Sequence, residues 1–136
     1  MQEFQRAVEA DDQEAIQALL ADDVVFRSPA VHTPYRGKAA TSVILAAVGQ
    51  VFEDFRYTAA VEQDGLSVLV FEAHVGEFEL EGADFIRVGD DGKIVDLRVM
   101  IRPLKGLNAV VEGMAKAIPG AMAQLGVSPE QMKASS

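Results

Sequence analysis

The sequence predicts an α+β fold in which a curved antiparallel sheet is wrapped by N-terminal helices to form a cone with an internal pocket. Apolar residues recur at helical spacing over the first fifty residues, whereas from residue 53 they alternate with polar residues. Helices followed by consecutive strands are typical of α+β domains rather than of alternating βαβ units. A long sheet must cover its apolar face, and the N-terminal helices are available to do so.

The first two helices are expected near the N-terminus. Apolar residues follow helical spacing around Phe4 and again over 15–20. Asp11 and Asp12 lie between these runs, and a carboxylate there can accept the free N–H groups of a second helix. We expect that helix to end at residues 22–23.

A short strand, a loop and a third helix are expected next. The strand begins with residues 24–26. Residues 27–37 are predicted to form a loop, because two prolines and a glycine in this segment interrupt any regular element. The third helix is expected over 38–52, where apolar residues again follow helical spacing.

Four consecutive strands are expected to form an antiparallel meander. Strict alternation begins at Phe55, and further strands are expected over 66–75, 77–88 and 93–102. Asp-Gly signals lie in the first and last of the intervening turns. A final helix is predicted over 104–118.

Length and charge limit the classes of protein. The 136 residues are expected to form one domain over 1–118, followed by an extension over 119–136 that is partly helical or flexible. The formal charge of −9 argues against nucleic acid or an anionic membrane as main partner. Neither signal-peptide features nor an apolar run of membrane-spanning length is present, so we expect a cytoplasmic protein.

No cofactor and no metal ion is expected. The chain has no cysteine, which excludes thiolate ligands and a cysteine nucleophile. Its acidic N-terminal residues do not follow calcium-loop spacing, and its two histidines form no metal-binding motif. A glycine-rich phosphate loop is also missing. The chemistry that remains open is proton transfer or water activation.

Several short motifs, in order along residues 1–104, resemble the nuclear-transport-factor-two-like (NTF2-like) superfamily. The branch they resemble most is that of the SnoaL-like polyketide cyclases and ketosteroid isomerases. The motifs are Ala15–Phe26, Ser28-Pro29, Tyr35–Ala40, Gly82–Val88, Asp90–Ile94 and Leu97–Val99. The resemblance implies a cystatin-like cone. It leaves the activity open, because this superfamily includes isomerases, cyclases, hydrolases and binding modules.

The catalytic groups of the relatives are matched only in part. The resemblance puts the acidic base of ketosteroid isomerase at Ser28, the tyrosine that donates to the oxyanion at Phe4, and the second, aspartic acid donor at Asp84. A hydroxyl at the base position cannot take a proton from carbon unaided, so steroid isomerisation by that mechanism is not expected. A carboxylate of the related epoxide hydrolases would fall on Val99. SnoaL-type cyclases, which depend mainly on one strand aspartate, are compatible with Asp84.

Asp84 is the first candidate for a functional group. Strand alternation places it on the same face as Leu80 and Ile86, so its carboxyl is expected among apolar side chains. Burial there would favour the neutral acid and raise the pKa of Asp84. The alternative is a structural carboxylate that accepts hydrogen bonds from Arg98 or Tyr35.

Three residues of the predicted loop are the next candidates. Histidine side chains titrate near neutral pH, so His32 could be the base that Ser28 is not, and Tyr35 could donate to a ligand carbonyl. The alternative is that the rings of His32 and Tyr35 cover the edge of the cone with their polar tips in water.

Arg98 has two possible placements. If it faces the cone, its guanidinium can orient Asp84 or bind a ligand carboxylate. If the alternating apolar residues of that strand face the cone, Arg98 lies on the outer face, and their uniform character favours this second placement. The residues that we expect to contact a ligand are Phe4, Phe26, Ser28, Phe71, Arg98 and Val99.

Three functions remain open. The first is an enzyme that isomerises, cyclises or hydrolyses a small, mostly apolar carbonyl or polycyclic compound, with Asp84 as acid or base and His32 and Tyr35 assisting. The second is a module that binds such a compound without catalysis, and the third is an interaction protein whose pocket is filled by its own side chains. The resemblance also implies a homodimer formed through the sheet.

Overall fold

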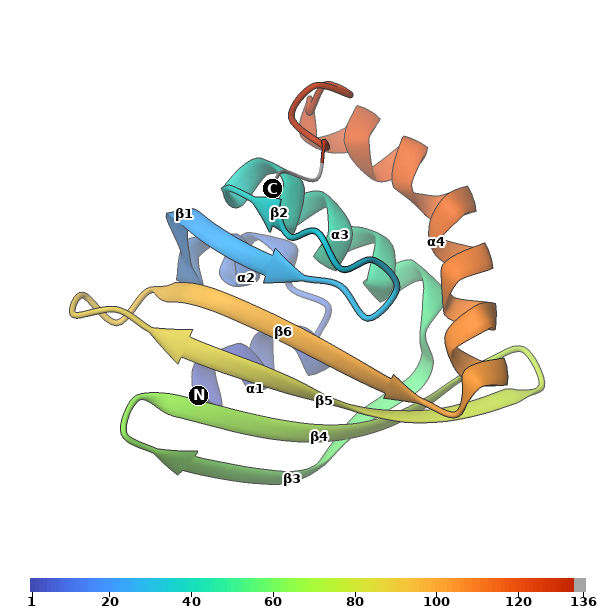
Figure 1. The fold of residues 1–136 in the computed structure, drawn as a ribbon, viewed down its shortest axis with the longest axis horizontal. Coiled ribbons are helices and arrows are strands. Elements are labelled where there is room, and N and C mark those ends of the chain that lie inside the picture. The colour runs from blue at the N-terminus through green and yellow to red at the C-terminus, as the bar shows by residue number, and fades with distance from the viewer. Residues whose placement is uncertain (134–136) are drawn as a thin grey trace.

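Residues 1–133 are described by the computed structural model, and within them six strands form one curved, unclosed mixed sheet in the order β2-β1-β6-β5-β4-β3 (Figure 1). The predicted α+β class is confirmed. In chain order the elements are α1 (Gln2–Glu9), α2 (Gln13–Leu19), β1 (Leu20–Arg27), β2 (Tyr35–Arg36), α3 (Lys38–Val51), β3 (Glu53–Gln63), β4 (Leu66–Val75), β5 (Phe78–Val88), β6 (Ile94–Arg102) and α4 (Leu104–Leu125).

The antiparallel meander predicted for the second half is present as β3 to β6. Two further strands extend it, because β1 pairs parallel to β6 and β2 pairs antiparallel to β1. Phe26 of β1 therefore lies between Leu97 of β6 and Tyr35 of β2. The prediction that 27–37 is only a loop was wrong at its end, where two residues satisfy backbone groups along the free edge of β1.

The boundary between α2 and β1 also differs from the prediction. The helix ends at Leu19, and Leu20 already belongs to the strand, where it pairs with Ile94. Leu20 is buried, so its apolar character fits a helix face and a strand face equally well. Periodicity cannot separate the two readings over so short a run.

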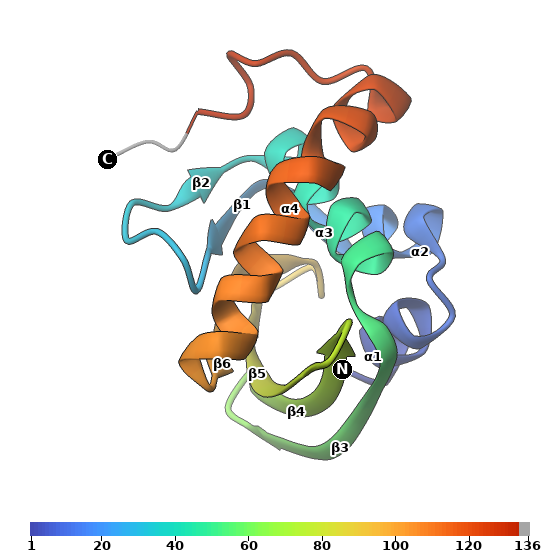
Figure 2. The same ribbon diagram turned by 90° about the vertical axis from the view of Figure 1, so that its right-hand side faces the viewer.

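The core lies between the concave face of the sheet and the helices (Figure 2). Phe4 of α1 and Ile44 of α3 pack there against the inward residues Phe26, Ile86 and Leu97 of three strands. Each of these five side chains is at most 5% exposed. Because side chains alternate along the strands, the apolar residues point inward and the residues between them lie on the convex face.

Helix α4 runs from the end of β6 across one end of the cone to α3 (Figure 2). The prediction that it ends at Ile118 was wrong, because the helix continues through Pro119 to Leu125. Pro119 removes only one backbone donor from the helix. Beyond it, Ala121 is fully buried against α3, and this packing stabilises the last turns. Gly126, with a φ of 65°, ends the helix in the left-handed conformation. The last three residues of the expected extension lie outside the described residues.

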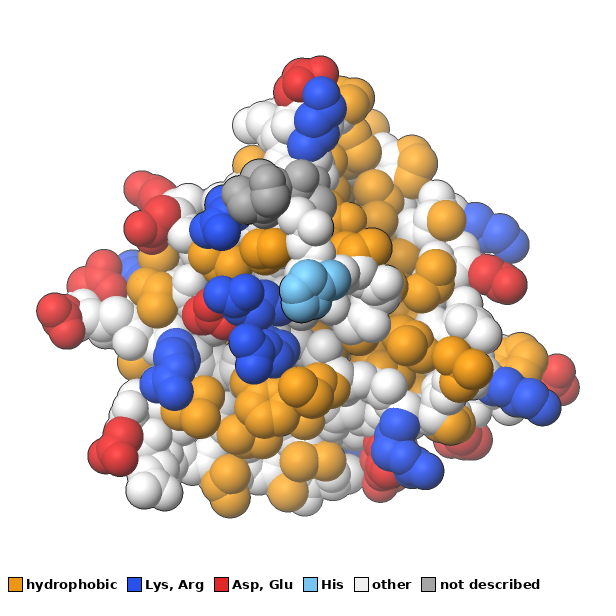
Figure 3. Space-filling model, in the orientation of Figure 1, with side chains coloured by type: hydrophobic (Ala, Val, Ile, Leu, Met, Phe, Trp, Pro, Cys, Tyr) orange, Lys and Arg blue, Asp and Glu red, His pale blue; other side chains and the backbone are white. Residues whose placement is uncertain are grey.

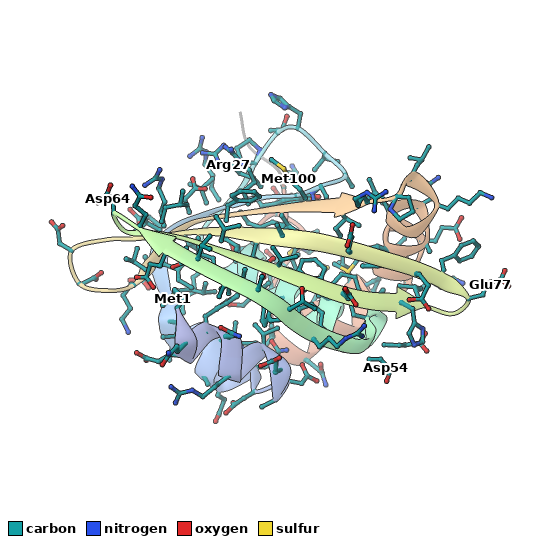
Figure 4. All side chains as sticks on the ribbon, turned by 90° about the horizontal axis from the view of Figure 1, so that it is seen from below. Met1, Arg27, Asp54, Asp64, Glu77 and Met100 are labelled. Carbon is teal, nitrogen blue, oxygen red and sulfur yellow. The ribbon has the colours of Figure 1, made fainter. Side chains whose placement is uncertain are left out.

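The convex face of the sheet is turned away from α1 and carries Arg27 and Met100 (Figure 4). Met100 is 52% exposed there. The homodimer expected through this face stays a prediction, as does the cytoplasmic location. None of the helices within the described part of the chain is long and apolar enough to cross a membrane.

We expect Gly106→Ala to destabilise the protein by about 1–3 kcal/mol, because a side chain there overpacks a tight contact. A Cβ at Gly106 would lie 2.8 Å from Leu80 Cβ and 2.9 Å from the Glu79 carbonyl oxygen. Gly120, in the same helix, has open space around it. The control Gly120→Ala should therefore stabilise by up to about 1 kcal/mol. Urea unfolding measures both, and equal effects of the two substitutions would contradict the close approach of α4 to β5.

Candidate functional site

A cavity of about 290 Å³ lies inside the cone. Its walls come from α1, α3 and α4 and from the inward faces of the sheet strands, and they are almost entirely apolar. Among the described residues, the polar side chains that line it are those of Ser28, Tyr35, Tyr57 and Asp84. Exposed apolar side chains gather along α4 and beside it in Figure 3. Val111 of the cavity wall, on α4, is 42% exposed.

Asp84 projects from the middle of β5 into this cavity. It pairs with Leu69 of β4 and Val99 of β6, and it is only 8% exposed. The alternation read from the sequence therefore placed its side chain correctly. Burial disfavours the charged carboxylate and raises the pKa of Asp84 to about 7, although a hydrogen bond from Tyr57 acts in the opposite direction.

Tyr57 of β3 is the hydrogen-bond partner of that carboxyl. Its hydroxyl donates to Asp84 Oδ2 over 2.7 Å. Burial, and after it the charge of Asp84, raises the pKa of Tyr57, so the phenol remains a donor. Tyr57 is not among the residues that the sequence predicted at the site. The available signal was alternation alone, because Phe55 and Tyr57 share one face of the strand.

The space between the two residues is shaped by a glycine. Tyr57 pairs with Phe71 of β4, and Phe71 pairs with Gly82 of β5. A Cβ at Gly82 would lie 2.5 Å from Phe71 Cζ, so only glycine leaves room for that ring. Phe71 in turn packs at right angles to Tyr57 and stacks with Phe55, with centroids 6.4 and 5.0 Å apart.

A bulge at the start of β3 brings two phenylalanines to the cavity. Phe52 and Phe55 are an odd number of residues apart, so regular alternation would point them to opposite faces. The register with β4 shifts between them, and Asp54 takes a left-handed conformation with a φ of 52°. His74 Nε2 lies 2.7 Å from Asp54 Oδ2, and this hydrogen bond raises the pKa of His74.

Most of the residues expected at the site do line the cavity. They are Phe4, Phe26, Ser28, Tyr35, Phe71, Asp84 and Val99. Tyr35 nevertheless does not belong beside Asp84, because β1 and β6 lie between their strands. The position next to the carboxyl is taken by Tyr57.

Two expectations about the site were wrong. Arg98 is exposed on the convex face, because its neighbours Leu97 and Val99 both point into the cavity; this is the placement that alternation favoured, so what was wrong is its inclusion among the expected ligand contacts. His32 is exposed and is not part of the cavity wall, to which its loop contributes residues 28–31 instead. Neither side chain is placed to act on a ligand inside the cone.

Within residues 1–133, no group of three or more histidine, aspartate and glutamate side chains is placed to hold an ion. The cavity wall contributes one carboxyl from the described chain and no histidine. Among the described groups of the wall, Asp84 can exchange a proton, and the hydroxyl groups can form hydrogen bonds with a ligand.

The arrangement can be compared with known proteins. A sequence model of the SnoaL-like domain family matches residues 1–97. The chain belongs to this family. Its fold is similar to the crystal structure of a steroid delta-isomerase from Pseudomonas aeruginosa, with 44% identity, a TM-score of 0.84 and 90% coverage of each chain. No functionally curated protein matches the sequence.

Two further solved structures show the same fold. One is a bacterial protein from Silicibacter pomeroyi with a cystatin-like fold, 31% identical, with a TM-score of 0.84 over 91% of this chain and 89% of that one. The other, from Xanthomonas campestris, is 18% identical with a TM-score of 0.66 over 80% and 92% of the two chains, and it supports the fold alone. The expected SnoaL-like family and cystatin-like fold are thereby confirmed.

Removing the hydroxyl of Tyr57 should raise the pKa of Asp84 above its value of about 7, because the hydrogen bond that favours the carboxylate is lost. The test is an NMR titration of the Asp84 carboxyl in the wild type and in Tyr57→Phe. Tyr35→Phe is the matched control, since it removes a hydroxyl from the same cavity on β2, which β1 and β6 separate from the strand of Asp84. An unchanged or lower pKa in Tyr57→Phe would contradict the assigned hydrogen bond.

The buried carboxyl should also make stability depend on pH. Burial raises the pKa of Asp84 from 3.8 to about 7, so between these values the folded chain keeps a proton that the unfolded chain has released. Stability should therefore fall as pH rises from about 4 to 7 and then level off. Asp84→Asn removes this loss and should gain up to about 4 kcal/mol over the wild type across that range. Urea unfolding at a series of pH values measures it, and parallel curves for the two proteins would refute it.

Proposed function

We propose that the protein binds a small, neutral, mostly apolar carbonyl compound in its cone and catalyses proton transfer next to the carbonyl, with Asp84 as acid and base. The observation that carries this proposal is the meeting of an apolar cavity with one buried carboxyl whose pKa lies near 7. A general acid or base works best when its pKa is near the working pH.

The charge of the cavity supports a neutral ligand. The described residues that line the cavity include no lysine, arginine or histidine. An anionic ligand would meet no cation there and would lie near the carboxyl of Asp84. A neutral compound leaves only its polar atoms to be satisfied, and Tyr57, Tyr35 and Ser28 offer hydroxyl groups for this.

One carboxyl is sufficient for a transfer between two carbon atoms. The ionised form of Asp84 takes a proton from the carbon beside the carbonyl, and the electrons of that C–H bond form an enolate. The neutral acid then returns the proton to a second carbon, which isomerises the compound. Exclusion of water from the apolar cavity strengthens the hydrogen bonds that hold the enolate oxygen.

Relatives support this class of ligand. The Pseudomonas aeruginosa structure that shares 44% identity is of a protein described as a steroid delta-isomerase. A fused-ring ketone also suits the shape of the aromatic wall, where Phe52, Phe55 and Phe71 pack with centroids 5.0–5.7 Å apart.

The second candidate is a binding module of the same fold without catalysis. It is favoured by the absence of a second titratable carboxyl or histidine from the described cavity wall, where the family resemblance places a base at Ser28. In that case Asp84 and Tyr57 would only orient the ligand.

The experiment is an isomerisation assay with androst-5-ene-3,17-dione, following the absorbance of the conjugated ketone. The wild type should convert it, with kcat/KM rising about tenfold per pH unit below pH 7 and levelling above, because the base is the ionised Asp84. Asp84→Asn should lose at least about 100-fold.

His32→Gln is the matched control, because it changes a polar residue of the same region that lies outside the cavity wall. Its rate should equal that of the wild type. Binding of the steroid without conversion would favour the binding module. Failure of the wild type to bind it would refute the ligand class.

A further inference from the structure

The polar groups of the cavity fall into two separate sets. Tyr57 and Asp84 form the first and are joined to each other by a hydrogen bond. Ser28, which follows β1, and Tyr35 of β2 form the second set, and β6 lies between β1 and the strand of Asp84. Ser28 lies two residues beyond Phe26, whose pairing partner is Tyr35, so the two side chains are diagonal neighbours on one face.

Strand register sets the distance between the two sets. Val99 pairs with Asp84, and the pairing of Arg27 with Arg98 places Ser28 level with Val99. Ser28 is therefore two strands from Asp84, which is about 10 Å at the usual strand spacing. Tyr35 is one strand farther, but its longer side chain reaches inward. Apolar side chains such as Leu97 and Val99 cover the wall between them.

The hydroxyl groups of the second set are free to donate. Tyr35 lines the cavity with its ring against Phe26, centroids 6.5 Å apart, and within residues 1–133 its hydroxyl forms no hydrogen bond. Ser28 Oγ accepts a hydrogen bond from the Ala30 backbone over 3.0 Å, which leaves its own proton for an acceptor. A donor in an apolar wall gains most from an acceptor on the ligand.

We infer that Tyr35 and Ser28 form a second binding subsite, which takes a hydrogen-bond acceptor at the far end of an elongated ligand. The inference rests on the proposed function and narrows its ligand class. The compound carries two oxygen atoms at opposite ends of a rigid apolar frame, one held by Asp84 and Tyr57 and the other by Tyr35 and Ser28. Tyr35 is thus a residue that determines specificity and does not take part in the proton transfer.

Two steroids that differ at one end test the subsite. Androst-4-ene-3,17-dione has a carbonyl at each end of the frame, and androst-4-en-3-one has only one. Equilibrium dialysis gives the dissociation constant of each. The wild type should bind the dione about fivefold more tightly, which is the size of one net hydrogen bond. In Tyr35→Phe this ratio should fall close to one.

The matched control is Tyr57→Phe, which removes a hydroxyl from the other end of the cavity. It should weaken both steroids together and leave their ratio as in the wild type. If Tyr35→Phe keeps the fivefold ratio, or if the wild type shows none, the subsite is refuted while binding at Asp84 stands. If neither steroid binds to the wild type, the proposed ligand class fails and the subsite fails with it.

Discussion

The burial of one carboxyl in an apolar cavity is the constraint on which the site and its surroundings depend. Asp84 cannot be charged there without cost, and its raised pKa expresses that cost. Tyr57 offsets part of it by donating to the carboxylate. The contact depends on Gly82, because the ring of Phe71, which packs against Tyr57, occupies the space that a side chain at residue 82 would need. The strand register, the glycine at residue 82 and the hydrogen bond between Tyr57 and Asp84 therefore depend on one another.

The helices contribute to that arrangement by covering the cavity with apolar side chains. Helix α4 covers one end of the cone and supplies apolar side chains such as Val110 and Met114 to the cavity wall. Its close approach to β5 at Gly106 holds it near the strand that carries Asp84. If α4 ended where the sequence predicted, α3 would lose the contact with Ala121 that anchors the far end of the helix. The desolvation that raises the pKa of Asp84 is thus a property of the whole fold.

Much of this architecture could be predicted from the sequence. Alternation of apolar and polar residues shows which face of a strand is buried, and turn residues show where strands end. Alternation alone placed Asp84 inside and favoured Arg98 outside. It could not find Tyr57 as the partner, because pairing between β3 and β5 passes through β4 and depends on the bulge at Asp54. The placement of His32 failed for a similar reason. Apolar residues do not recur at a regular spacing in a loop between two prolines, so the sequence does not show which of its side chains faces the cavity.

The substitution of a hydroxyl at Ser28 for the acidic base implied by the family resemblance changes the electrostatics of the whole cavity. A second carboxylate would repel the charge of Asp84 and add its own desolvation cost. With Ser28 in that place, burial is the main cause of the raised pKa of Asp84. The far end of the cavity is then a neutral donor surface made of Ser28 and Tyr35. With Ser28 in place of a second acid or base, the described cavity wall has one titratable carboxyl and hydroxyl groups that can bind a ligand. In the proton transfer we propose, that one carboxyl therefore has to act as both base and acid.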